Sequence, residues 1–190
     1  SVGFEMYCKL LEEAVQALKE GKPVEEIPEP VIEVQAEAYL DGGYIQDAMH
    51  KIEIYQRIAA IRTNDEIRNL LDELIDRFGE PTPVVMRLLE IARIRNYARR
   101  LGVRSIVEKP MVLEIFFGTK PGFVPENLMK LMELFGTNIK ALPQPQQMLR
   151  IRLMPSYKKD IVNFITRVLM MLSGEESGMQ RKAVLKRAAQ

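Results

Sequence analysis

Glu73 and Asp76 have a spacing at which two acidic side chains can do chemistry. Residues three apart on a helix lie on neighbouring turns, and paired carboxylates serve as acid, base or nucleophile in glycoside hydrolysis. Acid catalysis needs a carboxyl group whose pKa is raised by desolvation, and an open helix surface does not supply it. We therefore expect these residues to take part in recognition, and we assign no catalytic residue.

Other enzyme and metal motifs are missing from the sequence. There is no G-x-x-x-x-G-K-[ST] loop for nucleotide phosphates, and Gly21-Lys22 is followed by Pro23, which does not fit that motif. His50 is the only histidine and has no Cys or His partner at metal-binding spacing. We expect no metal and no cofactor.

Arginines form the second group of candidate binding residues. Arg93 and Arg100 fall on the polar side of a predicted helix, Arg104 follows it, and Arg150 and Arg152 alternate with apolar residues. Such residues can contact phosphates, but no exposed aromatic residues are interleaved for base stacking. A solvated face is favoured, and an accessory nucleic-acid-binding module remains the alternative.

Arg95 differs from these arginines because it falls in the middle of the apolar sector of its helix. A buried guanidinium is costly unless it is paired. We predict a structural role for Arg95, with a carboxylate or carbonyl partner.

The two carboxylates belong to one predicted helix within the segment Thr63–Pro81. Its apolar residues recur every three or four positions, at Ile67, Leu70, Leu71, Leu74 and Phe78. Thr63 and Glu66 have capping-box spacing, and Gly79 is expected to end the helix in a left-handed conformation. Asp72, Glu73 and Asp76 then lie on the polar side of its second half, where the helix dipole disfavours negative charge. Helix stability does not explain their placement, so docking and simple solvation both remain open.

Three further helices are predicted in the first half of the chain, over 4–19, 44–62 and 82–101, with an extended segment over 31–39. Cys8 lies on the apolar stripe of the first helix and indicates a reducing compartment. The buried stripe expected of the second helix consists of Ile45, Met49, Ile52, Tyr55 and Ala59.

The second half of the chain changes to alternating apolar residues. Strands are predicted over 104–107, 111–117, 139–142 and 148–153, with helices over 125–135 and 157–172. A helical half followed by a β-β-α-β-β-α half predicts an α+β fold with a small, mainly antiparallel sheet packed on helices. We expect a single domain over 1–172, mainly helical over 1–102 and α/β over 103–172, with a flexible tail over 173–190.

Composition limits the partners of the chain. Lys and Arg number 27 against 26 Asp and Glu, so no global basic field indicates nucleic-acid binding. No segment approaches the roughly 20 apolar residues that span a bilayer, and no membrane partner is expected. We expect a cytoplasmic protein, and the start at Ser1 is expected of a domain cut from a longer polypeptide.

Five sequence segments resemble one family in the same order. They are GFEMYCKLLEEAVQALK, VIEVQAEAYLDGGYIQD, IEIYQRIA, ELIDRFGEP and IARIRNYARRLGV, which run from Gly3 to Val103. They are similar to the C-terminal domain of bacterial transcription-repair coupling factors, the Mfd family. Beyond Val103 only the order of strands and helices is similar.

The resemblance implies a non-catalytic regulatory role. In that family the intact protein is an ATP-driven DNA translocase that displaces stalled RNA polymerase and recruits UvrA. The C-terminal domain packs on the N-terminal UvrB-like module and hides the UvrA-binding surface, while DNA is bound by the motor. The family's acidic contact positions fall on Glu73 and Asp76, with Asp72 as a flanking residue, and they face arginines of the UvrB-like module.

Overall fold

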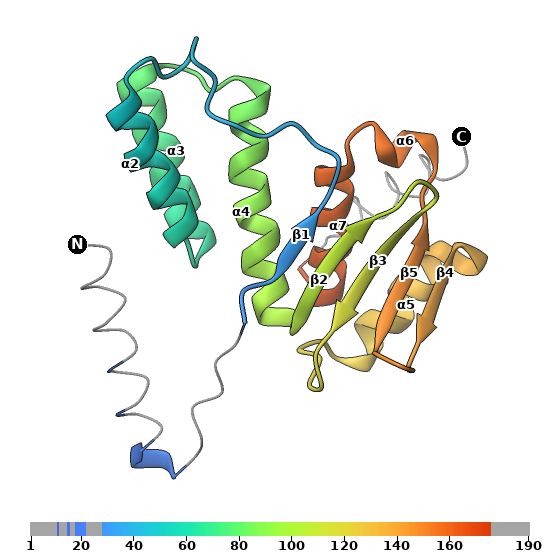
Figure 1. Cartoon of the computed structure of the whole chain (residues 1–190). Coiled ribbons are helices and arrows are strands. Elements are labelled where there is room, and N and C mark those ends of the chain that lie inside the picture. Colours follow the sequence, from blue (N-terminus) through green and yellow to red (C-terminus); the bar gives the residue numbers. More distant parts are fainter. Residues whose placement is uncertain (1–10, 12–14, 16–17, 22–27, 176–190) are drawn as a thin grey trace.

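The computed structural model describes residues 11, 15, 18–21 and 28–175, and these form an α+β fold (Figure 1), which confirms the predicted class. The helices are α2 (Ala48–Ala60), α3 (Asn64–Phe78), α4 (Pro83–Leu101), α5 (Pro125–Phe135), the 3-10 turn η1 (Gly136–Asn138), α6 (Pro155–Lys158) and α7 (Ile161–Ser173). The strands are β1 (Val31–Glu33), β2 (Val103–Glu108), β3 (Val112–Phe117), β4 (Ile139–Leu142) and β5 (Met148–Arg152).

The sheet has the strand order β1-β2-β3-β5-β4, and all neighbours are antiparallel except β1 and β2. β1 comes from the helical half of the chain and pairs Ile32 with Ile106, which the sequence did not predict. A parallel pair needs a long crossover connection, and α2, α3 and α4 lie within it. Helices α4, α5 and α7 pack on one face of the sheet (Figure 1).

The buried apolar residues form two clusters that meet along α4. Val85 and Leu89 pack with the residues of α2 and α3, whereas Tyr97 and Leu101 pack with the sheet and α7. One helix of about 28 Å therefore ties the two halves together. The predicted division at 102/103 stays a prediction, but the boundary between the clusters falls inside α4.

The predicted extended segment over 31–39 is a strand only over Val31–Glu33, and two predicted helices also differ clearly from the structure. α2 begins at Ala48, where the Asp47 side chain accepts a hydrogen bond of 2.9 Å from the His50 backbone N–H. The single helix predicted over 157–172 is two helices, α6 and α7, because the backbone leaves the helical conformation at Asp160, which caps α7.

The buried stripe predicted for α2 is wrong. Met49, Ile52 and Tyr55 are exposed by 71, 51 and 41%, while Ile54 and Ile58 face the core. Ile45 is buried as predicted, but it precedes the helix. This helix carries apolar residues on two sides, so spacing alone could not decide which side is buried. The apolar side chains on its outer side, Met49 and Ile52, are exposed.

The termini lie partly outside the described residues. Residues 11, 15 and 18–20 are helical, and the rest of the predicted first helix, with Cys8, is outside them. Of the predicted tail, Ser173 belongs to α7 and Glu175 contacts Tyr97 and Arg100, while 176–190 are not described. No helix in the described part has the length and apolar character needed to cross a membrane.

Candidate docking surface

Helix α3 holds the predicted acidic residues on a well-defined scaffold. The capping box is present, since the Thr63 side chain accepts from the Glu66 backbone N–H and the Glu66 carboxylate accepts from the Thr63 backbone N–H. Ile67, Leu70 and Leu74 fix the inner face of the helix in the core, as predicted. The second half of α3 therefore has a set orientation relative to α2 and α4.

Gly79 ends α3, but not in the conformation expected. Its φ is 84° and its ψ is −171°, so the positive φ is present while the left-handed helical ψ is not. The Tyr44 hydroxyl lies 2.8 Å from the Gly79 carbonyl oxygen and 3.1 Å from that of Leu74. This contact fastens the end of α3 to the segment before α2.

Glu73 is held by two arginines of its own domain. Its carboxylate lies 2.6 Å from Arg57 of α2 and 3.0 Å from Arg77 of α3, and Arg77 also contacts Glu53 at 3.3 Å. Hydrogen bonds from Arg57 first, and from Arg77, lower the pKa of Glu73 to about 2. These four side chains, Glu53, Arg57, Glu73 and Arg77, form an ionic seam between α2 and α3.

Asp72 and Asp76 lie on the same helix as Glu73 but take no part in the ion pairs of this seam. Both are exposed, and within the described part of the chain neither has an ion pair or side-chain hydrogen bond. On α3, Asp76 is one turn from both Asp72 and Glu73. The structure therefore separates the predicted trio into one engaged carboxylate, Glu73, and two free ones.

The engaged carboxylate, Glu73, is unsuited to general acid catalysis. A general acid needs a raised pKa, and that of Glu73 is lowered. His50 is half exposed, 4.0 Å from Asp47, and its ring meets Phe78 edge-on. No group of three or more His, Cys, Asp or Glu residues suited to a metal occurs among the described residues.

The predicted phosphate-contacting arginines are mostly engaged elsewhere. Arg93 pairs with Glu90 at 3.4 Å, Arg100 pairs with Glu175 at 3.2 Å and stacks on Tyr97, and Arg150 donates to Glu114 at 3.1 and 3.0 Å.

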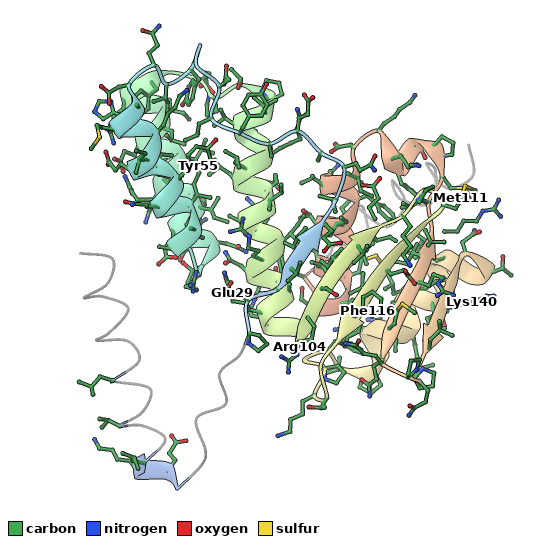
Figure 2. All side chains as sticks on the ribbon, in the orientation of Figure 1. Glu29, Tyr55, Arg104, Met111, Phe116 and Lys140 are labelled. Atoms are coloured by element: carbon green, nitrogen blue, oxygen red, sulfur yellow. The ribbon has the colours of Figure 1, made fainter. Side chains whose placement is uncertain are left out.

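Arg104 and Arg152 are exposed and have no side-chain partner within the described range 28–175. Arg152 pairs with Val112 beside Met111, whereas Arg104 is the second residue of β2, at the other end of the hairpin (Figure 2). They are separated by the length of β3, about 17 Å at 3.3 Å per residue. The structure does not gather the five arginines into one patch.

Arg95 is half-buried and lies near Arg99 and Arg62. Burial first, and then Arg99, lower its pKa, and Glu29 is the acid that raises it. Glu29 itself accepts two bonds from the Arg99 Nε at 3.2 and 3.1 Å, one from Nη2 at 2.9 Å, and lies 3.4 Å from Arg62. Within the described residues Arg95 has no direct hydrogen bond, so its predicted partner stays a prediction.

Sequence reasoning missed the cluster around Glu29, which lies near the C-terminal half of α4 (Figure 2). Glu29 and Arg99 are 70 residues apart, and no local pattern links them. It also missed Arg57 and Arg77 as partners of Glu73. The i, i+4 spacing of Glu73 and Arg77 was a signal that could have indicated one of these pairs.

The TRCF domain family matches residues 34–128, half of the 190-residue chain. The chain belongs to the TRCF domain family. The matched range contains α2, α3 and α4, and therefore all of the candidate docking surface. Arg150 and Arg152 lie outside it.

The curated proteins that are similar to this TRCF domain include transcription-repair-coupling factors. The transcription-repair-coupling factor of Staphylococcus haemolyticus (strain JCSC1435) is 40% identical over 123 residues, which cover 63% of this chain and 10% of the relative. That of Staphylococcus aureus (strain USA300) is 38% identical over 121 residues, again 63% of this chain and 10% of the relative. The chain spans about a tenth of the length of these proteins.

A solved structure is also similar. The crystal structure of the C-terminal domain of transcription-repair coupling factor matches with a TM-score of 0.65 and 30% sequence identity. The match covers 82% of this chain and 94% of that one. The match therefore covers more of the chain than the family range does.

Proposed function

We propose that this TRCF domain is a regulatory interaction domain of a transcription-repair coupling factor. It docks on the N-terminal UvrB-like module of the same polypeptide and covers the surface that UvrA binds. Membership of the TRCF domain family and the similar solved structure support the assignment of this domain to such a parent protein. The observation that carries the docking role is the pair of exposed carboxylates, Asp72 and Asp76, which lie on a capped helix and have no partner among the described residues.

The carboxylates have different tasks in this proposal. Asp76 meets an arginine of the module directly, and Asp72 adds charge beside it. Glu73 is already shared by Arg57 and Arg77, so a partner arginine must enter an existing network. We expect Glu73 to orient the contact and Asp76 to make it.

These contacts have the strength that a reversible clamp needs. Exposed ion pairs contribute about 0.2 to 1 kcal/mol each, whereas truncating one member of a desolvated interface pair costs roughly 2 to 5 kcal/mol. A few such pairs hold the parent closed and still allow a partner with higher affinity for the open form to shift the population.

The domain acts within a larger cytoplasmic machine in this proposal. The parent protein is an ATP-driven DNA translocase that displaces stalled RNA polymerase and recruits UvrA for excision repair. DNA and RNA polymerase are contacted by other parts of the parent. This domain supplies no catalytic residue and no cofactor.

The test is a binding titration of the chain against the separately expressed N-terminal region. Glu73→Ala combined with Asp76→Ala should weaken binding at least about tenfold, because each 1.4 kcal/mol is a factor of ten. The same change in the intact parent should increase UvrA binding. Glu133→Ala is the matched control, since Glu133 is exposed on α5 and has no ion pair in the described part. Unchanged affinity in both assays would overturn the assignment.

An accessory nucleic-acid-binding module is the second candidate. The exposed Arg104 and Arg152 favour it, but the pairing of Arg93, Arg100 and Arg150 with acids of the domain weakens it. Phosphate contacts lose affinity steeply as salt rises. If the isolated chain does not bind DNA at low salt, this candidate fails.

A further inference from the structure

One face of the five-stranded sheet is open. Helices α4, α5 and α7 pack on the other face, and no helix in the described part of the chain lies over this one (Figure 1). Side chains alternate between the two faces along each strand, so the strand register shows which residues the open face carries. In the central strand β3, Leu113 and Ile115 lie in the core. Val112, Glu114 and Phe116 therefore belong to the open face.

An apolar row crosses the open face from strand to strand. Phe116 of β3 pairs with Met148 of β5, and Met148 pairs with Leu142 of β4. Toward the other edge of the sheet, Phe116 pairs with Ser105, and Ser105 pairs with Val31. Phe116, Met148 and Leu142 are each half-buried. The ring of Phe116 therefore lies at the centre of the row and is partly accessible.

A charged row runs beside the apolar one. Glu114 pairs with Arg150, and Arg150 pairs with Lys140 of β4. Arg152 lies two residues further along β5 and therefore on the same face. Glu114 contacts Lys109 of the β2–β3 turn as well as Arg150, so two cations already share its single negative charge. These five side chains, which we call the cationic patch, have a clear excess of positive charge.

Much of this positive charge is available to a ligand. Lys140 and Arg152 are exposed, and among the described residues neither has an ion pair or a side-chain hydrogen bond. Arg150 is 41% exposed and uses only Nε and Nη2 to donate to Glu114. A guanidinium has five N–H donors, so Arg150 keeps donors for a further acceptor.

The pairing of Lys140 with Arg150 is unfavourable for the fold alone. Residues directly opposite each other on antiparallel strands have Cβ atoms about 5 Å apart, and like charges at such positions are destabilising. The edge strand β4 has no acidic residue that could separate them. An anion bound over this pair would remove the repulsion, and the pair therefore points to a ligand with negative charge.

The ligand of this face must combine several anionic groups with flat apolar groups. A single-stranded nucleic acid has both, because its phosphates pair with cations and its unpaired bases stack on aromatic rings. An acidic protein segment is less suited, since specific protein interfaces also need direct hydrogen bonds between neutral groups. The open sides of β3, β5 and β4 carry no neutral polar side chain that could make them.

We propose that the open face of the sheet binds single-stranded nucleic acid, with Lys140, Arg150 and Arg152 on the phosphates and Phe116 against a base. This goes beyond the docking role and uses a different surface from α3. Of the five arginines predicted from the sequence, only Arg150 and Arg152 belong to it. Binding does not depend on sequence, and DNA and RNA bind alike, because these strands offer no neutral polar side chain to read base edges or the 2′-hydroxyl.

The test is a fluorescence anisotropy titration of a labelled thymidine strand of about 15 nucleotides with the chain. Lys140→Gln with Arg152→Gln should weaken binding at least about tenfold at about 50 mM salt. It should also make the slope of log K against log salt shallower by about 1.4, since each single-strand phosphate contact contributes about 0.7. Lys130→Gln with Arg167→Gln is the control, because these residues lie on α5 and α7, which cover the other face. It should leave the slope unchanged.

Phe116→Leu tests the base contact separately. Leucine keeps an apolar side chain in the row and removes the ring, so binding of the thymidine strand should weaken about tenfold with an unchanged salt slope. Binding of a duplex of equal length should not respond to this change, because its bases are already stacked. Thermal unfolding checks the fold. The variant at Lys140 and Arg152 should keep or raise the melting temperature, since it removes unpaired like charges.

Several results would overturn this inference. They are the absence of binding at low salt, binding that both sheet variants leave unchanged, and a more than tenfold preference for RNA over DNA of the same length. Equal competition by a polyglutamate peptide of the same charge would mean that an acidic protein segment is the occupant. A melting temperature lowered by the double variant at Lys140 and Arg152 would mean that these cations serve the fold. The docking role of α3 is tested by a different measurement, so either proposal can fail alone.

Discussion

The carboxylate of Glu73 on α3 lies 2.6 Å from the guanidinium of Arg57 on α2. This pair joins the two helices that carry the proposed docking surface. It gives Glu73 a structural task that Asp76, only three residues later, does not have. Substitutions at the two positions should therefore have different effects.

Glu73→Ala should lower stability, and Asp76→Ala should not. Loss of the exposed pair with Arg57 costs about 0.5 kcal/mol, or roughly 1 to 2 °C in melting temperature for a domain of this size. Asp76→Ala should leave the melting temperature unchanged and still weaken docking. Thermal unfolding of the two single variants measures this, and equal losses of stability would contradict it.

The Glu73 contribution should depend on pH in a defined window. Its folded-state pKa of about 2 lies below the ordinary value of 4.5, so the pair stabilises the folded state above about pH 4.5. This stability is lost as the pH falls toward 2. The stability difference between the wild type and Glu73→Gln, measured by urea unfolding, should be constant from pH 5 to 7 and shrink below pH 4.5. A difference that grows as the pH falls would contradict the assignment.

Gly79→Ala should destabilise the end of α3. The combination of φ 84° and ψ −171° is accessible almost only to glycine, and forcing a side chain into such a region costs about 1 to 3 kcal/mol. No atom lies within 4 Å of the added Cβ, so the cost comes from the backbone alone. Gly42→Ala is the matched control, because its φ is not positive and its added Cβ meets only Lys51 Nζ at 3.7 Å. Urea unfolding should therefore show a larger loss of unfolding free energy for Gly79→Ala than for Gly42→Ala.

Glu114→Gln should destabilise the sheet. The side chain is only 2% exposed, and its carboxylate contacts Lys109 and Arg150, which lower its pKa. Because both cations are half exposed, we expect a loss of about 1 to 3 kcal/mol instead of the larger cost of a fully buried pair. Glu33→Gln on the exposed surface of β1 should cost far less. Comparable losses would mean that the Glu114 contacts contribute little.

Local patterns predicted most of the elements, because caps, breakers and periodicity act over a few residues. Thr63, Glu66 and Gly79 marked the ends of α3, and alternation marked β3 and β5. The pairing of β1 with β2 was not predicted, since it joins Ile32 to Ile106 across the helical half. The extended segment over 31–39 was predicted, but a local pattern does not tell which strand such a segment pairs with.

The candidate site was predictable only in part. Spacing placed Asp72 and Asp76 on the outside of α3, where they lie. It did not reveal that Glu73 is tied to Arg57, because that contact depends on how two helices pack. The prediction of the buried stripe of α2 was wrong for the same reason. Met49 and Ile52 follow helical spacing as well as Ile54 and Ile58 do, and only tertiary packing decides between them.

The cluster around Glu29 gives a final prediction, in which Arg99→Gln should cost more stability than Arg95→Gln. Arg99 is 15% exposed and grips Glu29 with two nitrogens, and charge-assisted bonds of this kind contribute about 1.5 to 3 kcal/mol. Arg95 lies near Arg99 and Arg62, and like charges oppose its burial. Its removal relieves that repulsion and breaks no hydrogen bond among the described residues. Chemical unfolding of the two variants measures the order, and a larger loss for Arg95→Gln would mean that Arg95 has a partner beyond those residues.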